Sequence, residues 1–255
     1  MDSLAARLWA ARQSGTVIAP GDIVEPASNE EAYAVQAEIV ALSGLDVKGF
    51  KVGSTSAEAQ RILGTDEPGS GAIFAPYLHE SPARVTLSAA HMPAIEGEFG
   101  FRLGRDLAPR DEPYGYEDMQ PAIDAVAGSV EVVGTRIEGG LAGKGRFLVT
   151  ADGGANIALI TGAWQTDWKG IDLKAHRVAV HINGQPGGAG EGARALGDPI
   201  NVLVWLANQQ SKFGRGLKAG DIVSTGTCTG LDGVKPGDHV VADYGSLGQV
   251  EIDFV

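Results

Sequence analysis

Hydrophobic residues near the start of the chain recur at helical spacing. Leu4 and Leu8 lie one turn apart and predict a first amphipathic helix. The segment 29–44 predicts a second helix, with Ser28 or Asn29 as its N-cap and a glycine at its end. This part of the chain is therefore expected to be mostly helical.

A short apolar segment follows and is interrupted by one basic residue. The alternation over 47–56 predicts a strand in which Lys51 stands alone on the face opposite its apolar neighbours. The segment 55–64 predicts a further helix, because Thr55 and Glu58 have the spacing of a capping box.

Beyond about residue 73, the spacing of hydrophobic residues changes from the helical repeat to the two-residue alternation of β-strands. Short segments alternate between apolar and polar residues and are bounded by Gly, Asp or Pro. Asn183–Gly184 is a typical hairpin turn between two such segments. The segments are "ARVTL", "IEGEFGFRLG", "GSVEVV", "NIALITGAW", "HRVAVHING", "DIVSTG", "DHVVADYG" and "GQVEIDFV".

Two predicted helices interrupt these strands. One covers 115–127, with Pro121 marking the start of its regular part, and the other covers 198–214. We find no alternation of helices and parallel strands, no nucleotide-binding glycine motif and no internal repeat. The predicted fold class is α+β, with a mostly helical N-terminal domain over 1–72 and a β-rich domain over 73–255.

Composition narrows the function classes. The chain has 255 residues, a hydrophobic content of 44% and no apolar run of membrane-spanning length. The start of the chain lacks the pattern of a secretory signal, so a cytoplasmic location is expected. The net charge of −12 argues against a nucleic-acid partner, and a single cysteine, Cys228, excludes an intramolecular disulfide or a cysteine-based zinc site.

The segment "AIEGEFGF" places two glutamates on one face of a strand. Glu96 and Glu98 are two residues apart, whereas Ile95, Phe99 and Phe101 occupy the other face. Two carboxylates on one face repel each other unless water or a cation lies between them. The pair is therefore either the polar face of a half-solvated strand or a pair of ligands for a hard divalent metal.

A third acidic residue stands alone in an apolar strand. Glu131 in "GSVEVVGTR" points away from Val130 and Val132, although a solvent-facing glutamate on an edge strand would show the same pattern. Three carboxylates that leave open positions for water and substrate are typical of a Mg²⁺ or Mn²⁺ site.

At this point the sequence resembles a known family over nearly its whole length. The landmarks run in order: "GFKVGSTS", "EPGSG", "IEGEFGFRLGRDL", "SVEVVGTR", "VHINGQ", "LGDPINVLVWLAN", "LKAGDIVSTGTCTG" and "VKPGDHVVADYGSLGQVEIDF". The resemblance is to the 2-oxopent-4-enoate hydratase and 4-oxalocrotonate decarboxylase family of the fumarylacetoacetate-hydrolase superfamily. It implies a mixed β-roll body and a homo-oligomer, possible association with a pathway partner enzyme, and small 2-oxo or 2-hydroxydienoic acid substrates from the catabolism of aromatic ring-cleavage products.

The resemblance also implies site residues and a mechanism. A metal held by Glu96, Glu98 and Glu131, either Mg²⁺ or Mn²⁺, would chelate the 2-oxo and carboxylate oxygens and stabilise an enolate during hydration or decarboxylation. Lys51 corresponds to the lysine of the family's "K-x-G-x-T-S" segment and is expected to clamp a carboxylate or donate a proton. The same landmarks imply substrate contacts from Lys51, Ser56, Arg136, Asp152 and Thr225, although a structural ion pair is an alternative for Arg136.

Three departures from the family pattern bear on hydratase activity. Gly69 stands where hydratases of the family usually have an acid, and Gly134–Thr135 stands where the distal strand often continues with "D-S". Asp152 is followed by Gly153–Gly154 where a serine-bearing segment is usual. These changes remove a candidate proton-transfer group and possible substrate contacts.

Two alternative functions follow from the same resemblance. One is hydrolysis of a C–C bond in an acylpyruvate, for which His79–Glu80 is a weaker candidate for water activation, because adjacent residues on an extended segment point apart. The other is a non-catalytic accessory or binding member that keeps the fold and has lost its acid–base groups.

Overall fold

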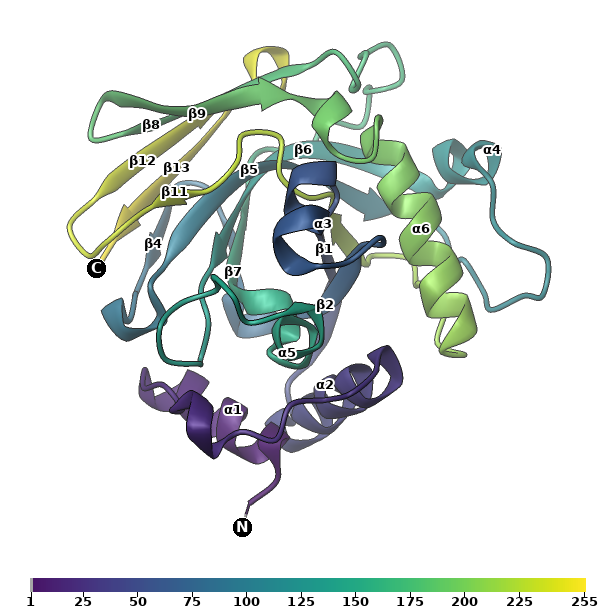
Figure 1. Ribbon diagram of the computed structural model, residues 1–255. Helices are drawn as coiled ribbons and strands as arrows, with labels where there is room; N and C mark the ends of the chain where they lie inside the picture. The colour runs from purple at the N-terminus through teal and green to yellow at the C-terminus, as the bar shows by residue number, and fades with distance from the viewer. Residues whose placement is uncertain (1) are drawn as a thin grey trace.

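The computed structural model describes residues 2–255, and its fold is α+β, as predicted. Two N-terminal helices precede a β-rich body whose larger sheet curls around α3 and α5 (Figure 1). The helices are α1 (Leu4–Ser14), α2 (Asn29–Ser43), α3 (Ala57–Leu63), α4 (Tyr116–Met119), α5 (Arg146–Ala151) and α6 (Pro199–Lys212).

The body contains two sheets. The larger has eight strands in the order β2-β1-β10-β5-β6-β7-β3, with β11 paired to β5, and the smaller has the order β4-β13-β12-β8-β9. The strands are β1 (Val47–Gly53), β2 (Gly69–Phe74), β3 (Leu78–Glu80), β4 (Ala83–Val85), β5 (Ala94–Leu103), β6 (Ile123–Val133), β7 (Asn156–Thr161), β8 (Arg177–Ile182), β9 (Gln185–Glu191), β10 (Ile222–Ser224), β11 (Asp232–Gly233), β12 (His239–Asp243) and β13 (Gln249–Phe254).

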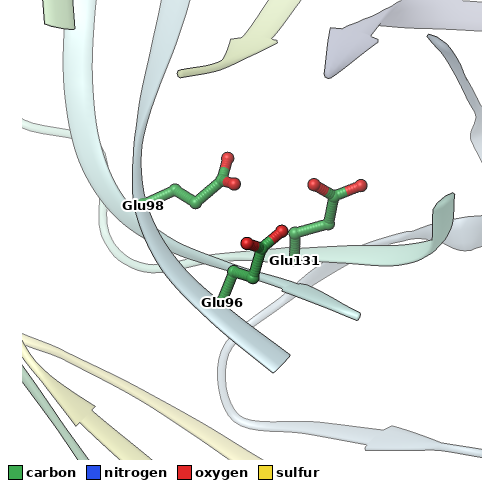
Figure 2. A group of neighbouring side chains, drawn as sticks. All are labelled: Glu96, Glu98 and Glu131. Carbon is green, nitrogen blue, oxygen red and sulfur yellow. The ribbon is translucent and has the colours of Figure 1, made fainter. Parts of the chain in front are cut away.

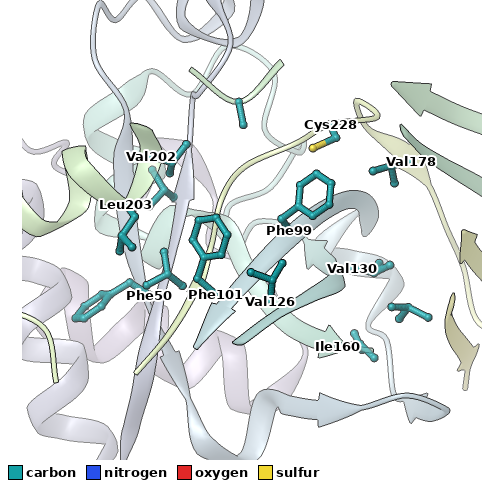
Figure 3. Packing of buried hydrophobic residues seen from close by; sticks show 14 of the residues in the cluster. Phe50, Phe99, Phe101, Val126, Val130, Ile160, Val178, Val202, Leu203 and Cys228 are labelled. Carbon is teal, nitrogen blue, oxygen red and sulfur yellow. The ribbon is translucent and has the colours of Figure 1, made fainter. Parts of the chain in front are cut away.

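Both sheets contribute to one hydrophobic core. Phe99 and Phe101 on β5 pack with Val130 on β6 and with Val178 on the smaller sheet (Figure 3). The ring of Tyr244 lies edge-on to Phe99, with 6.0 Å between the ring centroids. Because β5 and β6 are buried on the side that carries these residues, their alternate side chains must face the opposite side, where the glutamates lie.

A second cluster attaches the N-terminal helices to the body. Leu8, Trp9 and Ile39 pack against Phe74 at the end of β2. The N-cap of α2 is Ser28, whose hydroxyl accepts a hydrogen bond from the Glu31 backbone N–H, as the sequence predicts.

Three local predictions require correction or extension. The helix predicted to begin at Pro121 is wrong: α4 ends at Met119, and β6 begins at Ile123, so apolar residues that suggested a helix lie in a buried strand. The α3 cap is Ser56, which accepts from Ala59 N–H, rather than Thr55. Strand β9 was not predicted, although the Asn183–Gly184 turn that leads into it was.

The division into domains over 1–72 and 73–255 remains a prediction, and its boundary falls within β2. Among residues 2–255, none of the helices has both the length and the apolar character required to cross a membrane.

Candidate metal centre

The three glutamates singled out in the sequence lie together on one face of β5 and β6. The antiparallel register places Glu96 directly opposite Glu131, and Glu98 lies two residues further along the same face. One carboxylate oxygen from each residue lies within 4.8 Å of the others. Figure 2 shows the three side chains converging on a common space. Alternation gave each glutamate its face, and the pairing of β5 with β6 brings together the three residues that the family resemblance implies.

Burial decides between the two interpretations of these strands. Glu98 and Glu131 are fully buried, so the half-solvated polar face is excluded for both. Burial, with repulsion from Glu131, raises the pKa of Glu98 well above its usual value and that of Glu96 to about 7. Glu98 Oε1 has no hydrogen-bond partner among the described residues. Such a group must hold a proton or a cation.

Lys51 on β1 supplies one positive charge beside the cluster. Its Nζ lies 3.2 Å from Glu131 Oε2, and both side chains are buried. Burial alone would lower the pKa of Lys51, but the carboxylates of Glu131, Glu96 and Glu98 outweigh burial and raise it. Three carboxylates and one ammonium leave an excess of negative charge on oxygen ligands, which fits a hard divalent cation.

Neighbouring groups hold two of the carboxylates in orientation. The Ser224 hydroxyl and the Gly226 backbone N–H donate hydrogen bonds to Glu98 Oε2. Asn156 Nδ2 donates to Glu131 Oε1 at 2.9 Å. Ser224 and Asn156 were not predicted from the sequence, although each is a buried polar residue at the end of a mainly apolar strand, a signal similar to the one that identified Glu131.

Arg136 and Asp152 form a separate buried pair. Arg136 Nε donates to Asp152 Oδ1 at 2.6 Å, and the other carboxylate oxygen accepts from Arg136 N–H and from the Thr135 hydroxyl. The remaining guanidinium nitrogens donate to backbone carbonyls of Gly134, Asp152 and Asn156. The structure thus places both residues in a closed network, and their role as substrate contacts remains a prediction.

The other two predicted substrate contacts also have local partners. Ser56 Oγ is the N-cap of α3, and Thr225 Oγ1 donates to the Phe99 carbonyl at 3.0 Å. The structure brings together Lys51 and the three glutamates, and it does not bring Ser56 or Thr225 into the wall of the adjacent cavity. Their assignment stays a prediction.

Two of the departures from the family pattern have steric explanations. A side chain at Gly134 would place Cβ 2.7 Å from the His91 carbonyl oxygen. Gly154 has a positive φ of 66°, and a Cβ there would lie 3.1 Å from Lys51 Cδ. The glycine therefore leaves room for the aliphatic stem that carries the Lys51 ammonium to Glu131.

A cavity of about 280 Å³ adjoins the cluster at Lys51 and Glu96. Gly69 lines it, so the position where the family usually has an acid does face this space. Residues of α3, of 65–69 and of α5 form much of the remaining wall, together with Leu141 and Leu231. His79, the weaker candidate for water activation, lines a different cavity, and Glu80 is exposed on β3.

Comparison with known proteins identifies the superfamily and the family of this chain. The family model "Fumarylacetoacetate (FAA) hydrolase C-terminal" matches residues 75–255, so the chain belongs to the fumarylacetoacetate-hydrolase superfamily. Within it, the chain is a member of the 2-keto-4-pentenoate hydratase and 4-oxalocrotonate decarboxylase family, and it is an enzyme of this hydratase and decarboxylase class. The relatives that support this assignment match over nearly their full lengths.

Three of these relatives illustrate the match. The 2-keto-4-pentenoate hydratase of Paraburkholderia xenovorans (strain LB400) is 35% identical, over 99% of this chain and 94% of its own. The 2-hydroxyhexa-2,4-dienoate hydratase of Comamonas testosteroni is 32% identical, over 97% and 95%. The structure of 4-oxalocrotonate decarboxylase from Pseudomonas putida G7, complexed with magnesium and adipate, has a TM-score of 0.88 at 27% identity, covering 99% and 96%.

Proposed function

We propose that the protein hydrates a 2-hydroxy-2,4-dienoate to a 4-hydroxy-2-oxo acid with the help of a divalent metal. The observation that carries the proposal is the convergence of Glu96, Glu98 and Glu131 beside Lys51 at the wall of a cavity. The full-length relatives named above as hydratases, at 35% and 32% identity, favour hydration over decarboxylation.

The reaction balances without a further co-reactant. The oxygen of water forms a bond to C4 of the dienoate, and C3 and C5 each gain a proton. One of these protons comes from water and the other from the 2-hydroxyl, which becomes the 2-oxo group. When bound, the metal supplies a Lewis acid for the negative charge that develops on the 2-oxygen.

The chain's own residues have separate roles in this scheme. Glu96, Glu98 and Glu131 would hold the metal, with Ser224 and Asn156 fixing two of the carboxylates. Lys51 lies beside Glu131 and lines the cavity, so it can hold a substrate carboxylate or donate a proton there.

The first experiment follows the conjugated absorbance of 2-hydroxypenta-2,4-dienoate. Metal-stripped protein is expected to leave it unchanged, and adding Mg²⁺ or Mn²⁺ to restore its decay, with 4-hydroxy-2-oxopentanoate as the product. Decay that is equally fast after metal removal would contradict the proposal.

Product analysis separates the alternatives. Release of CO₂ from 4-oxalocrotonate with no hydration would identify the decarboxylase branch, and cleavage of an acylpyruvate would identify a C–C hydrolase. Tight metal binding without turnover of any of these acids would indicate a non-catalytic member. Mg²⁺ or Mn²⁺ as the resident ion, homo-oligomeric assembly, association with a pathway partner enzyme and the cytoplasmic location remain predictions.

A further inference from the structure

The cavity beside the cluster has one polar end and a mainly apolar remainder. Lys51 and Glu96 line it where it meets the glutamates. Leu63, Val149 and Leu231 are among the side chains that line it elsewhere, and they come from three segments that are distant in the sequence. An apolar wall of this kind contributes affinity in proportion to the apolar surface that a ligand buries on it.

The volume of the cavity exceeds what the reacting part of a substrate needs. A cavity of about 150 Å³ accommodates benzene, which has six carbon atoms. On that scale the 280 Å³ found here holds roughly eleven or twelve non-hydrogen atoms. A five-carbon 2-oxo acid has eight, so space for roughly four more carbon atoms is left.

The charges along the wall bear on the chemistry of those additional atoms. Among the described residues that line the cavity, the cationic side chains are Lys51 and Arg146. Lys51 is paired with Glu131, and Arg146 is paired with Glu67 at 2.9 Å. Asn29 contacts both members of the Arg146–Glu67 pair: its Oδ1 accepts a hydrogen bond from Arg146, and its Nδ2 donates one to Glu67. The Arg146–Glu67 pair carries no net charge, so a second carboxylate on the substrate would meet the Glu67 carboxylate beside the Arg146 guanidinium.

We infer that the substrate is a monocarboxylic 2-hydroxydienoate with an apolar tail of about four carbon atoms, and that Leu141 and Leu231 help to select it. This inference rests on the proposed function and specifies its substrate class. The tail occupies the apolar part of the cavity, and the Glu67–Arg146 pair disfavours a substrate with a carboxylate at its far end.

The test measures binding rather than turnover. The affinity of the metal-loaded protein for saturated 2-oxo acids is obtained by calorimetry, with 2-oxopentanoate, 2-oxononanoate and 2-oxoadipate as probes. Each buried methylene adds up to about fourfold, so 2-oxononanoate is expected to bind on the order of 100-fold more tightly than 2-oxopentanoate. 2-Oxoadipate is expected to bind more weakly than 2-oxononanoate.

Two exposed leucines provide a matched comparison. Leu231 is 58% exposed at the cavity, and Leu42 on α2 is 50% exposed and lies outside its wall. Leu231→Asp and Leu141→Asp are expected to remove most of the preference for the long tail, and Leu42→Asp to leave it intact. Glu67→Gln frees Arg146 and is expected to raise the affinity for 2-oxoadipate about tenfold.

The outcomes distinguish this inference from the proposed function. Equal affinities for the short and long acids, or a wild-type preference for 2-oxoadipate, would overturn the inference even where 2-hydroxypenta-2,4-dienoate is hydrated. A long-tail preference that Leu231→Asp abolishes would support it even if hydration of the five-carbon acid is not observed, because binding is measured separately.

Discussion

Two groups of buried charges differ in how their polar atoms are satisfied. In the Arg136–Asp152 pair, both carboxylate oxygens and each guanidinium nitrogen have hydrogen-bond partners. In the glutamate cluster, Glu98 Oε1 has no partner among the described residues, and Glu131 Oε2 has only the ion pair with Lys51. The first group is complete as it stands, and the second is complete only with a ligand.

This difference separates a structural role from a functional one. Buried charges are costly unless they are paired and hydrogen-bonded, so a saturated network needs no further group to explain it. An unsatisfied buried carboxylate oxygen requires a proton or a cation. We therefore expect changes in the first group to act on folding, and changes in the second to act on metal binding and turnover.

The largest effect is expected for Glu98→Gln, which keeps the shape of the side chain and removes its charge. The value of kcat/KM should fall about 10³-fold, because a charged metal ligand is lost where negative charge develops. The melting temperature of the metal-free protein should not fall, because the raised pKa of Glu98 already favours its neutral form, which glutamine resembles in charge and shape. Steady-state kinetics and thermal unfolding measure the two effects, and Glu251→Gln on the exposed side of β13 is the control.

An unaltered metal affinity in Glu98→Gln would show that the cluster is not the metal site. A large fall in melting temperature would show that Glu98 is a structural residue, and the contrast with Asp152 would disappear.

The next effect is expected for Asp152→Asn, which leaves the Arg136 guanidinium buried without its counter-charge. The free energy of unfolding should fall by about 3–5 kcal/mol, as when one partner of a buried pair is removed. Urea unfolding measures this change. Asp124→Asn is the matched control, because the Arg102–Asp124 pair at 2.5 Å is partly exposed and should contribute less than about 1 kcal/mol.

If Asp152→Asn folds with full stability but loses substrate affinity, the pair belongs to the substrate site after all. That result would favour the role that the family resemblance implies for both residues.

The smallest of these effects is expected for Ser224→Ala. The hydroxyl donates to Glu98 Oε2, and removing a group that orients a metal ligand lowers metal affinity by about 10- to 100-fold. Metal titration by calorimetry measures it, with Ser211→Ala near the end of α6 as the control. Equal affinity in both variants would mean that the Gly226 N–H alone orients Glu98.

The sequence was sufficient to predict which face of its strand each glutamate occupies, for a physical reason. In a strand, side-chain direction alternates, so an isolated acid among apolar residues must face away from the core. This holds for Glu96, Glu98 and Glu131, and the register of β5 and β6 then brings them together. Asn156 and Ser224 lie on other strands. The local sequence around each of them does not indicate which distant carboxylate it will contact.

The errors in the predicted fold also have identifiable causes. Apart from Asp124, residues 123–127 are small or apolar, and with Pro121 before them their short-range pattern suits a helix, but pairing with β5 makes them a strand. Strand β9 is rich in glycine and lacks a hydrophobic alternation, so only its pairing with β8 reveals it. In both cases a partner strand decides the structure, and a single segment does not contain that information.

Because Glu96 lies opposite Glu131, the proposed metal centre can form only when β5 and β6 pair in the correct register. A slip of one residue between β5 and β6 would turn Glu131 to the opposite face of the sheet and scatter the three carboxylates. The same slip would turn Val130 and Val132 out of the core, and the misaligned chain could not gather the three carboxylates. If the glutamates hold the proposed metal, its binding energy is available only to the chain with the correct register, and the ion then favours the correct pairing of β5 and β6.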